Sequence, residues 1–527
     1  MANITVSTMV LTDKRTETMS KSKHKARQKD SNVTLNQTLG SLVSKLWFYL
    51  VFILLPLYMN KDMYTAMIQA KGKCFWFIGV ICIAGVIIYY IQGVISKQYQ
   101  WNITLKQWNL LDVGMLLFGI SVLISFLLSE DKLMCLKGEN GFYCGTFLCL
   151  TSVMLYFFLS RNLISTKQLW DMVMIVSDII FVWIFLNSVS VDILNMHDAI
   201  IVEQYFSYFA SLGNSNSVSA YLCFLIPVGL VFFLNADKKS DQWFYGSFAV
   251  LGILAAVSIH TEGVWIGLVI MLLVFLPYSF SSWERLERLM VLGMAVGGVL
   301  FILKLFSLFI PERMYLGVSI STYLIRYWAG AVLFIVCFLV YLYCRKGRRY
   351  VKEAILKKIS YVLVAMIVIG IAGYVLSVIR SFDASYGSGR GAIWMGSVQL
   401  FGEYSVTEKL FGLGTEMIKE RLTVLVSAIH NTGQNFANCH NNILECLLSL
   451  GLFGLFSYIF VWVFVVKEYI DGLKKGVTKE QAAYFMALIA YFGQSIVGNP
   501  YSLSAPIVFV MLALLRNQSF GRGGALQ

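Results

Sequence analysis

The sequence predicts an all-α polytopic membrane protein. Of its 527 residues, 58% are hydrophobic and 13% are charged, whereas a soluble domain is about half apolar and a quarter charged. The apolar residues gather in blocks of roughly 18–24, the length that crosses a bilayer as a helix. The basic residues lie mostly between these blocks, as in cytoplasmic loops. The formal net charge of +13 therefore does not indicate a nucleic-acid-binding protein.

Fourteen segments have the composition of membrane helices, and we expect about 12–14 of them to span the bilayer. The first carries Lys45 and the last two are short, so these three have the weakest signal. In chain order, the segments are residues 42–59, 74–94, 108–128, 141–160, 168–188, 216–235, 243–260, 264–280, 289–310, 325–344, 359–379, 442–466, 480–498 and 502–516.

Residues 1–41 form a basic arm with almost no apolar periodicity, which predicts a disordered segment. We expect no cleavable signal peptide, because this polar arm is far too long for a signal n-region. With the arm in the cytoplasm, the positive-inside rule also places the basic loops 344–358 and 467–480 there. The acidic stretch 191–204 then lies outside. The short tail 517–527 is expected in the cytoplasm, so both termini are cytoplasmic.

One long loop, residues 380–441, separates the helices of residues 42–379 from the C-terminal helices of 442–516. This topology places the loop outside the cell membrane. Long connections are usually functional or disordered, and the aromatic residues here favour a folded loop. The stretch "GAIWMGSVQLFGEY" predicts an amphipathic helix that packs on the bundle or on lipid headgroups; its apolar residues are Ile393, Val398, Leu400 and Phe401.

The external loops carry the side chains best suited to chemistry. Of five histidines, His197, His260, His430 and His440 fall outside, and the long loop adds Arg380, Arg390 and Arg421. Arginine binds phosphate oxygens bidentately, and histidine accepts a proton near neutral pH. This combination suits a reaction with a phosphorylated lipid leaving group, although a lone histidine is more often structural. The ten cysteines are scattered without a CxxC pair, so neither a disulfide framework nor a zinc site is expected.

Three stretches resemble the bacterial O-antigen ligase/O-antigen polymerase superfamily. "HNNILECLLSLGLFGL" (440–455) fits His-Asn-x-x-Leu followed by Gly-x-x-Gly-Leu. "SLGNSNSVSAYLCFLIPVGL" (211–230) is similar to a Gly-Asn-x-Asn element that leads into a proline-containing helix. "SGRGAIWMGSVQLFGEYSVTEKLFGLGTEMI" (388–418) is similar to the Ser-x-Arg…Trp…Phe…Gly-x-Gly segment before the histidine. They occur in family order, within loops already expected outside.

The resemblance implies a membrane-embedded C-type glycosyltransferase in the cytoplasmic (inner or cell) membrane. Such an enzyme takes a glycan from an undecaprenyl-diphosphate donor and transfers it to a glycan or lipid-glycan acceptor on the outer face. It implies inversion without a metal or other cofactor. His440 takes the place of the catalytic histidine, as general base, and Arg390 that of the arginine that stabilises the diphosphate. Asn216, from the Gly-Asn-x-Asn element, and Asn441 become candidate substrate-binding residues; turn and capping roles are the alternative.

One position departs from the family pattern. Where the superfamily often has Ser-Arg-Gly in an external turn, this chain has Glu262 in "IHTEGVWIGL". An acid repels a diphosphate, so we expect Arg326, Arg380 or Arg313 to replace the lost cation. Otherwise Glu262 has another task, such as orienting His260 or holding an acceptor hydroxyl.

The motifs leave the acceptor open. A ligase joins the glycan to a lipid core, a polymerase to another repeat unit, and a protein O-oligosaccharyltransferase to a protein hydroxyl. The short C-terminal tail argues against the last, and polymerase is slightly favoured over ligase. A polysaccharide transporter or flippase is the alternative from another class, but transport paths carry ionisable residues near the bilayer midplane. The predicted spans have few central charges; Asp178 is the clearest, and a position near a helix end is the alternative for it.

Overall fold

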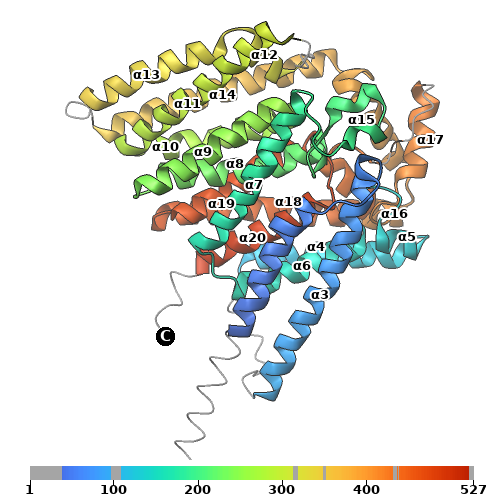
Figure 1. Ribbon diagram of the computed structural model, residues 1–527. Helices are drawn as coiled ribbons and strands as arrows, with labels where there is room; N and C mark the ends of the chain where they lie inside the picture. The colour runs from blue at the N-terminus through green and yellow to red at the C-terminus, as the bar shows by residue number, and fades with distance from the viewer. Residues whose placement is uncertain are drawn as a thin grey trace, which may run out of the picture.

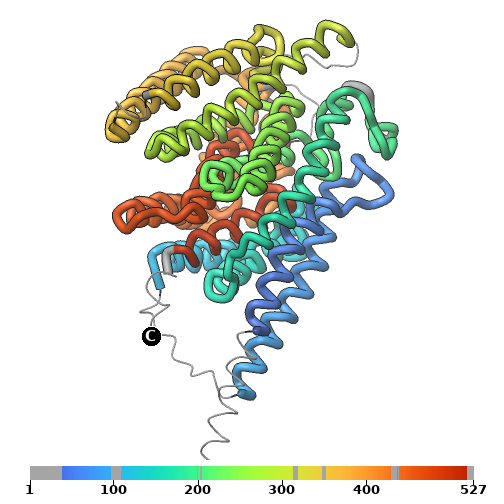
Figure 2. Tube along the Cα trace, turned by 60° about the vertical axis from the view of Figure 1, so that its left-hand side comes forward, coloured from blue at the N-terminus to red at the C-terminus, as the bar shows by residue number. Residues whose placement is uncertain are grey.

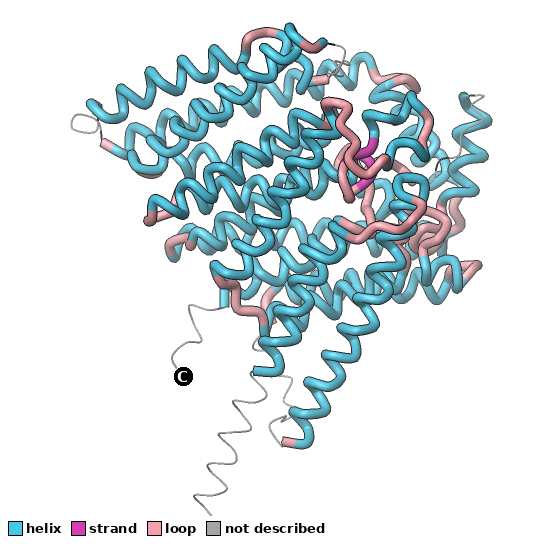
Figure 3. Tube along the Cα trace, in the orientation of Figure 1, coloured by secondary structure: helices cyan, strands magenta, loops and turns pink. Residues whose placement is uncertain are grey.

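The computed structural model describes residues 38–96, 108–311, 319–347, 352–430, 436 and 438–520. The predictions for the basic arm up to residue 37, for the tail beyond residue 520 and for Arg313 lie outside these residues. The described chain is a bundle of helices with a two-stranded antiparallel hairpin of β1 (Tyr208–Phe209) and β2 (Gly213–Asn214) (Figures 1 and 3). The predicted fold class, an all-α polytopic membrane protein, is confirmed.

Every one of the fourteen predicted segments is helical. In chain order these helices are Thr38–Leu57, which includes a π-helical turn (Leu50–Leu54) and α2 (Leu55–Leu57), then α3 (Met67–Ile95), α4 (Leu110–Leu128), α6 (Thr146–Asn162), α7 (Lys167–Ser188), α8 (Ser215–Leu234), α9 (Lys239–Ser258), α10 (Glu262–Ser279), α11 (Trp283–Phe309), α13 (Ala329–Gly347), α14 (Glu353–Ser381), α18 (Asn442–Lys475), α19 (Lys479–Ser495) and α20 (Ser504–Phe520). Within the described ranges, ten helices are long and apolar enough to cross a membrane. The others, α6, α9, α19 and α20, fall short in length or hydropathy.

Helix α8 is the centre of the bundle. Its apolar window is 100% buried, and it packs against α9, α10 and α19. The helix begins where the side chain of Asn214 accepts the backbone N–H of Asn216 at 2.9 Å, which is a common N-terminal cap. The Gly-Asn-x-Asn element therefore lies at the end of the most buried helix.

Helices α11, α13 and α14 lie at the top of Figure 2, where α11 packs against α13 and α14 packs against α10. These three helices meet the rest of the bundle through α8, α9 and α10. None of the apolar window of α14 is buried inside the protein, which fits a helix that faces lipid on most of its circumference.

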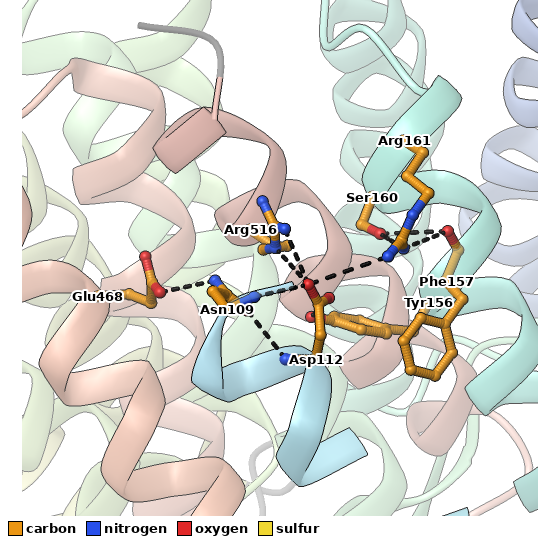
Figure 4. Close-up of polar contacts among 8 residues, drawn as sticks. All are labelled: Asn109, Asp112, Tyr156, Phe157, Ser160, Arg161, Glu468 and Arg516. Carbon is orange, nitrogen blue, oxygen red and sulfur yellow. Dashed lines mark hydrogen bonds and ion pairs between the residues drawn. The ribbon is translucent and has the colours of Figure 1, made fainter. Parts of the chain in front are cut away.

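A buried ion pair ties helices together at one end of the bundle (Figure 4). Asp112 on α4 is 0% exposed and accepts bonds from Arg516 on α20 at 2.8 and 3.1 Å and from the Tyr156 hydroxyl on α6 at 2.8 Å. Next to it, the side chain of Asn109 donates to Glu468 on α18 at 2.7 Å. These polar groups satisfy one another, which is the condition for burying charge at tolerable cost.

The predicted long loop folds into three helices at the opposite end, at the right of Figure 1: α15 (Tyr386–Glu403), α16 (Val406–Phe411) and α17 (Lys419–His430). On α15, Ile393 and Leu400 are buried in a cluster with α17 and the start of α18. Val398 does not pack there, because it is 64% exposed. The remaining short helices are α5 (Lys132–Lys137), α12 (Ile320–Arg326) and the 3-10 turns Met63–Ala66, Met196–Ala199 and Val202–Ser207.

Candidate active site

Helix α18 is broken near its start, and this break positions the candidate site. Gly451 has φ +68° and ψ −168°, so the helix divides there into a short first half and a long second half. The break frees the carbonyls of Leu448 and Ser449. The backbone N–H groups of Leu413 and Gly414 donate to them at 3.1 and 3.0 Å. A break in a membrane helix is tolerated when neighbouring groups satisfy the freed carbonyls in this way.

The motif glycines allow this close approach of two backbones. A Cβ on Gly412 would lie 2.3 Å from the carbonyl carbon of Ser449. A Cβ on Gly451 would lie 2.4 Å from the carbonyl carbon of Leu410. The Gly-Leu-Gly stretch and the first glycine of the Gly-x-x-Gly pair thus fasten the first half of α18 to the loop before α17.

His440 lies directly before this half-helix, in the left-handed region at φ +48°. Asn441 is the N-cap and accepts the N–H groups of Ile443 and Leu444 at 2.9 and 3.1 Å, so the cap predicted from the sequence is present. Asn442 does not share that role, because its side chain donates to the Tyr491 hydroxyl at 3.3 Å. A left-handed, non-glycine residue held by its surroundings is a feature that clusters at functional sites.

Glu445 and Asn438 hold the backbone on either side of His440. The Glu445 carboxyl accepts the N–H of Cys439 at 3.0 Å and the Ser449 hydroxyl at 3.2 Å. The Asn438 side chain accepts the N–H of His440 at 3.1 Å. From the other side, the Trp394 indole donates to the Cys439 carbonyl at 3.1 Å. Trp394 on α15 therefore helps to hold the segment that carries the histidine.

The imidazole of His440 is held through Nδ1, 3.1 Å from the side-chain amide nitrogen of Asn499. Burial, and then the positive charge of Arg390, lower the pKa of His440 to about 4. The ring is therefore neutral at neutral pH, and the contact with Asn499 involves Nδ1 and not the other ring nitrogen, Nε2.

Arg390 is the fifth residue of α15 and donates to the Gly387 carbonyl at 3.3 Å. Its Nε is buried and has no hydrogen-bond partner among the described residues. Burial lowers the pKa of Arg390, while the nearby Tyr501, Tyr386 and Glu262 raise it. An arginine kept charged in a confined place with an unused donor is suited to an anionic ligand.

Sequence reasoning missed the loop after α19. Tyr501 is 4% exposed, and burial raises its pKa to about 12, while Asn499, Arg390 and Asn216 act against that rise. The signal was available as "GNPYS" (498–502), a polar turn between two apolar helices. Such a stretch is usually only a connection.

His440, Arg390, Asn499 and Tyr501 form one polar cluster. Some of the other predicted residues belong to this cluster, and others lie at the surface. Asn216 belongs to the cluster: its side chain accepts the Thr261 hydroxyl at 3.4 Å and faces Tyr501. Glu262 accepts the backbone N–H of Ile320 at 3.1 Å and so caps α12. Arg326, at the end of α12, and Arg380, at the end of α14, are exposed, and no contact with the cluster is seen for either in the described chain.

His260, His197 and Arg421, which were predicted to lie outside, have partners elsewhere in the described structure. His260 contacts the hydroxyls of Ser319 and Thr322 at 3.3 and 3.4 Å, and these contacts help to orient it. His197 is paired with Asp192 at 2.9 Å. Arg421 is paired with Glu408 and Glu130, at 2.7 and 2.9 Å. The side chain of His430 lies outside the described part of the structure.

An apolar cavity of about 140 Å³ lies on the inner side of the first half of α18, bounded also by α4 and α20. Its polar edge contains Asn442, Glu445 and Glu416. Glu416 accepts the N–H groups of Phe142 and Cys144, both at 3.0 Å. Burial and the nearby Glu445 raise the pKa of Glu416 to about 8. Among the residues the structure describes, no group of three or more His, Cys, Asp or Glu side chains fits a metal ion.

Fold and site together define a multi-pass membrane protein with a polar cluster of histidine, arginine, tyrosine and asparagine at one end. A family model described as O-Antigen ligase matches residues 318–459, the segment that contains Arg390, α15–α17, His440 and the break in α18. This match confirms the resemblance to the O-antigen ligase/polymerase superfamily and supports a role in polysaccharide ligation or polymerisation. The Gly-Asn-x-Asn element at residues 211–230 lies outside the matched residues. None of the curated proteins matches the chain.

Proposed function

We propose that this protein transfers a glycan from an undecaprenyl-diphosphate-linked donor to an acceptor hydroxyl, as a polysaccharide polymerase or ligase. The O-antigen ligase match supports the class of reaction. The observation that carries the proposal is that a neutral His440 and a charged Arg390, both half-buried, lie close enough for the charge of Arg390 to act on the ring. They come from the two ends of the folded loop, which the motif glycines fasten to α18.

Arg390 binds the diphosphate of the donor. As the glycosidic bond breaks, negative charge builds on the leaving phosphate oxygen, and a guanidinium already in place stabilises it. Preorganised charge of this kind is worth several kcal/mol in a water-poor site. The buried Nε of Arg390, without a protein partner in the described structure, is available for this bond. Asn216 and Tyr501 belong to the same polar cluster and supply further polar contacts to the donor.

His440 removes the proton from the acceptor hydroxyl through Nε2 while the hydroxyl oxygen attacks the anomeric carbon. The ring is neutral near pH 7 because its pKa is lowered to about 4, so the competent form predominates. A positioned general base contributes about 10²–10⁴-fold. Attack on the face opposite the diphosphate inverts the anomeric centre. In this proposal the reaction needs no metal, as the superfamily resemblance implies.

The orientation follows from the basic segments. The loops 344–358 and 467–480 are rich in Lys and Arg. Their described residues, 344–347, 352–358 and 467–480, lie at the end of the bundle away from α15–α17 (Figure 1). The positive-inside rule places that end in the cytoplasm. The polar cluster of His440 and Arg390 then lies at the outer face of the cytoplasmic membrane, where lipid-linked glycans meet their acceptors.

Product size tests the reaction. The purified protein is reconstituted in vesicles with a defined lipid-diphosphate-linked repeat unit, and the products are separated by length. A ladder identifies a polymerase, and a single addition to a lipid-glycan acceptor identifies a ligase. Passage of intact lipid-linked glycan across the vesicle membrane without any transfer would overturn the proposal in favour of a transporter.

A further inference from the structure

Asn499 is the residue that touches the ring of His440, although 59 residues separate them. It lies in the turn between α19 and α20 and is 1% exposed. Its amide nitrogen is 3.1 Å from Nδ1 of His440 and 3.5 Å from the Tyr501 hydroxyl. Its amide oxygen is buried and has no hydrogen-bond partner among the described residues. A fully buried amide with one end unpaired is costly, which calls for an explanation.

The turn that carries Asn499 is firmly held. A Cβ on Gly498 would lie 2.4 Å from the Gln494 side-chain nitrogen, so the chain turns tightly there. The Tyr501 ring meets the edge of Phe142 at a centroid distance of 4.8 Å, and the Tyr501 N–H donates to the Ser504 hydroxyl at 3.3 Å. The backbone of Asn499 is thus fixed, while its amide group can turn about its own bond.

Whether the nitrogen or the oxygen of the Asn499 amide faces the ring determines whether Nε2 of His440 carries a proton or a lone pair. If the amide nitrogen faces Nδ1, it donates to that nitrogen, and the single proton of the neutral ring resides on Nε2. If the amide turns by 180°, its oxygen accepts a hydrogen bond from Nδ1–H, the proton of the neutral ring resides on Nδ1, and Nε2 carries a lone pair. Only the second arrangement lets Nε2 accept a proton from a hydroxyl.

We propose that Asn499 is a positioning residue that orients His440 and fixes its tautomer, with the amide oxygen facing Nδ1 in the active enzyme. In that arrangement the Tyr501 hydroxyl donates to the same oxygen and keeps the amide turned. Asn499 acts through His440 and contacts neither the donor nor the acceptor. This inference rests on the proposed function, because it assigns a partner to the proposed base.

The pH dependence of His440 depends on a small set of neighbours. Arg390 on α15 is the charged group that acts directly on the ring. Tyr501 from the turn, Tyr386 on α15 and Glu262 on α10 act on Arg390. Replacing Asn499 by a carboxylate adds a negative charge at Nδ1, which favours the protonated ring and raises its pKa.

Two substitutions test the inference, with transfer measured as kcat, KM and a pH profile. Asn499→Ala removes the contact, and we expect kcat to fall by about 10²-fold with KM nearly unchanged, the usual cost of misplacing a catalytic group. Asn499→Asp keeps the shape and can only accept from Nδ1. We expect it to retain kcat within about tenfold at its own optimum, with the acid limb moved to higher pH. Asn517→Ala, on the neighbouring α20, is the control and leaves both quantities unchanged.

The outcomes separate this inference from the proposed function. Wild-type kcat and an unmoved pH profile in both Asn499 variants, together with an inactive His440→Ala, would overturn the role of Asn499 and leave the proposed function standing. An Asn499→Asp variant as slow as Asn499→Ala would show that Nε2 must carry a proton, which contradicts the proposed tautomer. Full activity of His440→Ala would instead overturn the general base itself. If Asn499→Ala does not fold, the kcat and pH profile of the isosteric Asn499→Asp variant test the inference on their own.

Discussion

Gly451 lies against the backbone of Leu410, so close that a Cβ at residue 451 would be 2.4 Å from the Leu410 carbonyl carbon. This contact joins the break in α18 to the folded loop and so places His440 opposite Arg390. The glycines of the two motifs are therefore structural residues, whose effect on chemistry is indirect.

Replacing Gly451 by alanine should damage both stability and transfer. The substitution adds a Cβ that meets the backbone of Leu410 and Phe411. It also forces on an alanine a positive-φ conformation that glycine alone adopts readily, which costs about 1–3 kcal/mol before the collision is counted. We expect a lower melting temperature in detergent and a loss of transfer activity. Gly402→Ala is the matched control, because a Cβ at Gly402 on α15 meets nothing within 4 Å. Equal melting temperatures for the two variants would contradict this account of the break.

The acid limb of the activity profile should lie near pH 4. His440 has a lowered pKa of about 4, so the neutral ring is lost only when the pH falls through that value. Arg390→Gln removes a repelling cation, which raises the pKa and moves the limb of the residual activity to higher pH. Arg421→Gln should not move it, because Arg421 is paired with Glu408 and Glu130. The measurement is kcat against pH for all three proteins.

Stability should fall as the pH rises from about 5 to 8. Glu416 has a pKa raised to about 8, so between its ordinary value and pH 8 the folded state binds more protons than the unfolded state. The unfolding free energy therefore declines with rising pH across that window. In Glu416→Gln the slope of melting temperature against pH should be smaller. The exposed Glu403→Gln serves as the control, and an unchanged slope in Glu416→Gln would refute the assignment.

Breaking the ion pair between Asp112 and Arg516 should destabilise the bundle strongly. Arg516 is 4% exposed. The substitution Asp112→Asn removes the carboxylate that pairs with Arg516 and leaves the arginine charge buried. Loss of one partner from a buried pair costs about 3–5 kcal/mol. The control is Asp471→Asn, which removes the partner of Lys467 in a pair whose side chains are 38% and 51% exposed, where little change is expected. Denaturant or thermal unfolding in detergent measures both, and equal stabilities would contradict the prediction.

The sequence predicted the helices well because the signal is local. An apolar block of the right length has few options in a bilayer other than a helix, and all fourteen segments, even the one with Lys45, are helical. The break at Gly451 was not predicted, because a glycine in an apolar run equally fits close helix packing. Only the contact between Gly451 and Leu410 distinguishes a helix break from close helix packing.

The candidate site was predicted in part. His440, Arg390 and Asn216 carry motif signals and lie in one cluster. Asn499 and Tyr501 were missed because their partners are distant in sequence and their own stretch has the composition of a simple turn. Glu262 was recognised as unusual, but its bond to the N–H of Ile320 depends on where α12 lies, and no local pattern contains that information.

The most direct test of the account is the transfer rate of His440→Ala beside that of His260→Ala. Both histidines lie before a helix with positive φ, and burial lowers the pKa of both to about 4, but Arg390 acts on His440. With equal amounts of folded protein in vesicles and a lipid-diphosphate-linked glycan, we predict that His440→Ala loses about 10²–10⁴-fold in kcat. His260→Ala should stay close to the wild type. A wild-type rate for His440→Ala would contradict the central claim.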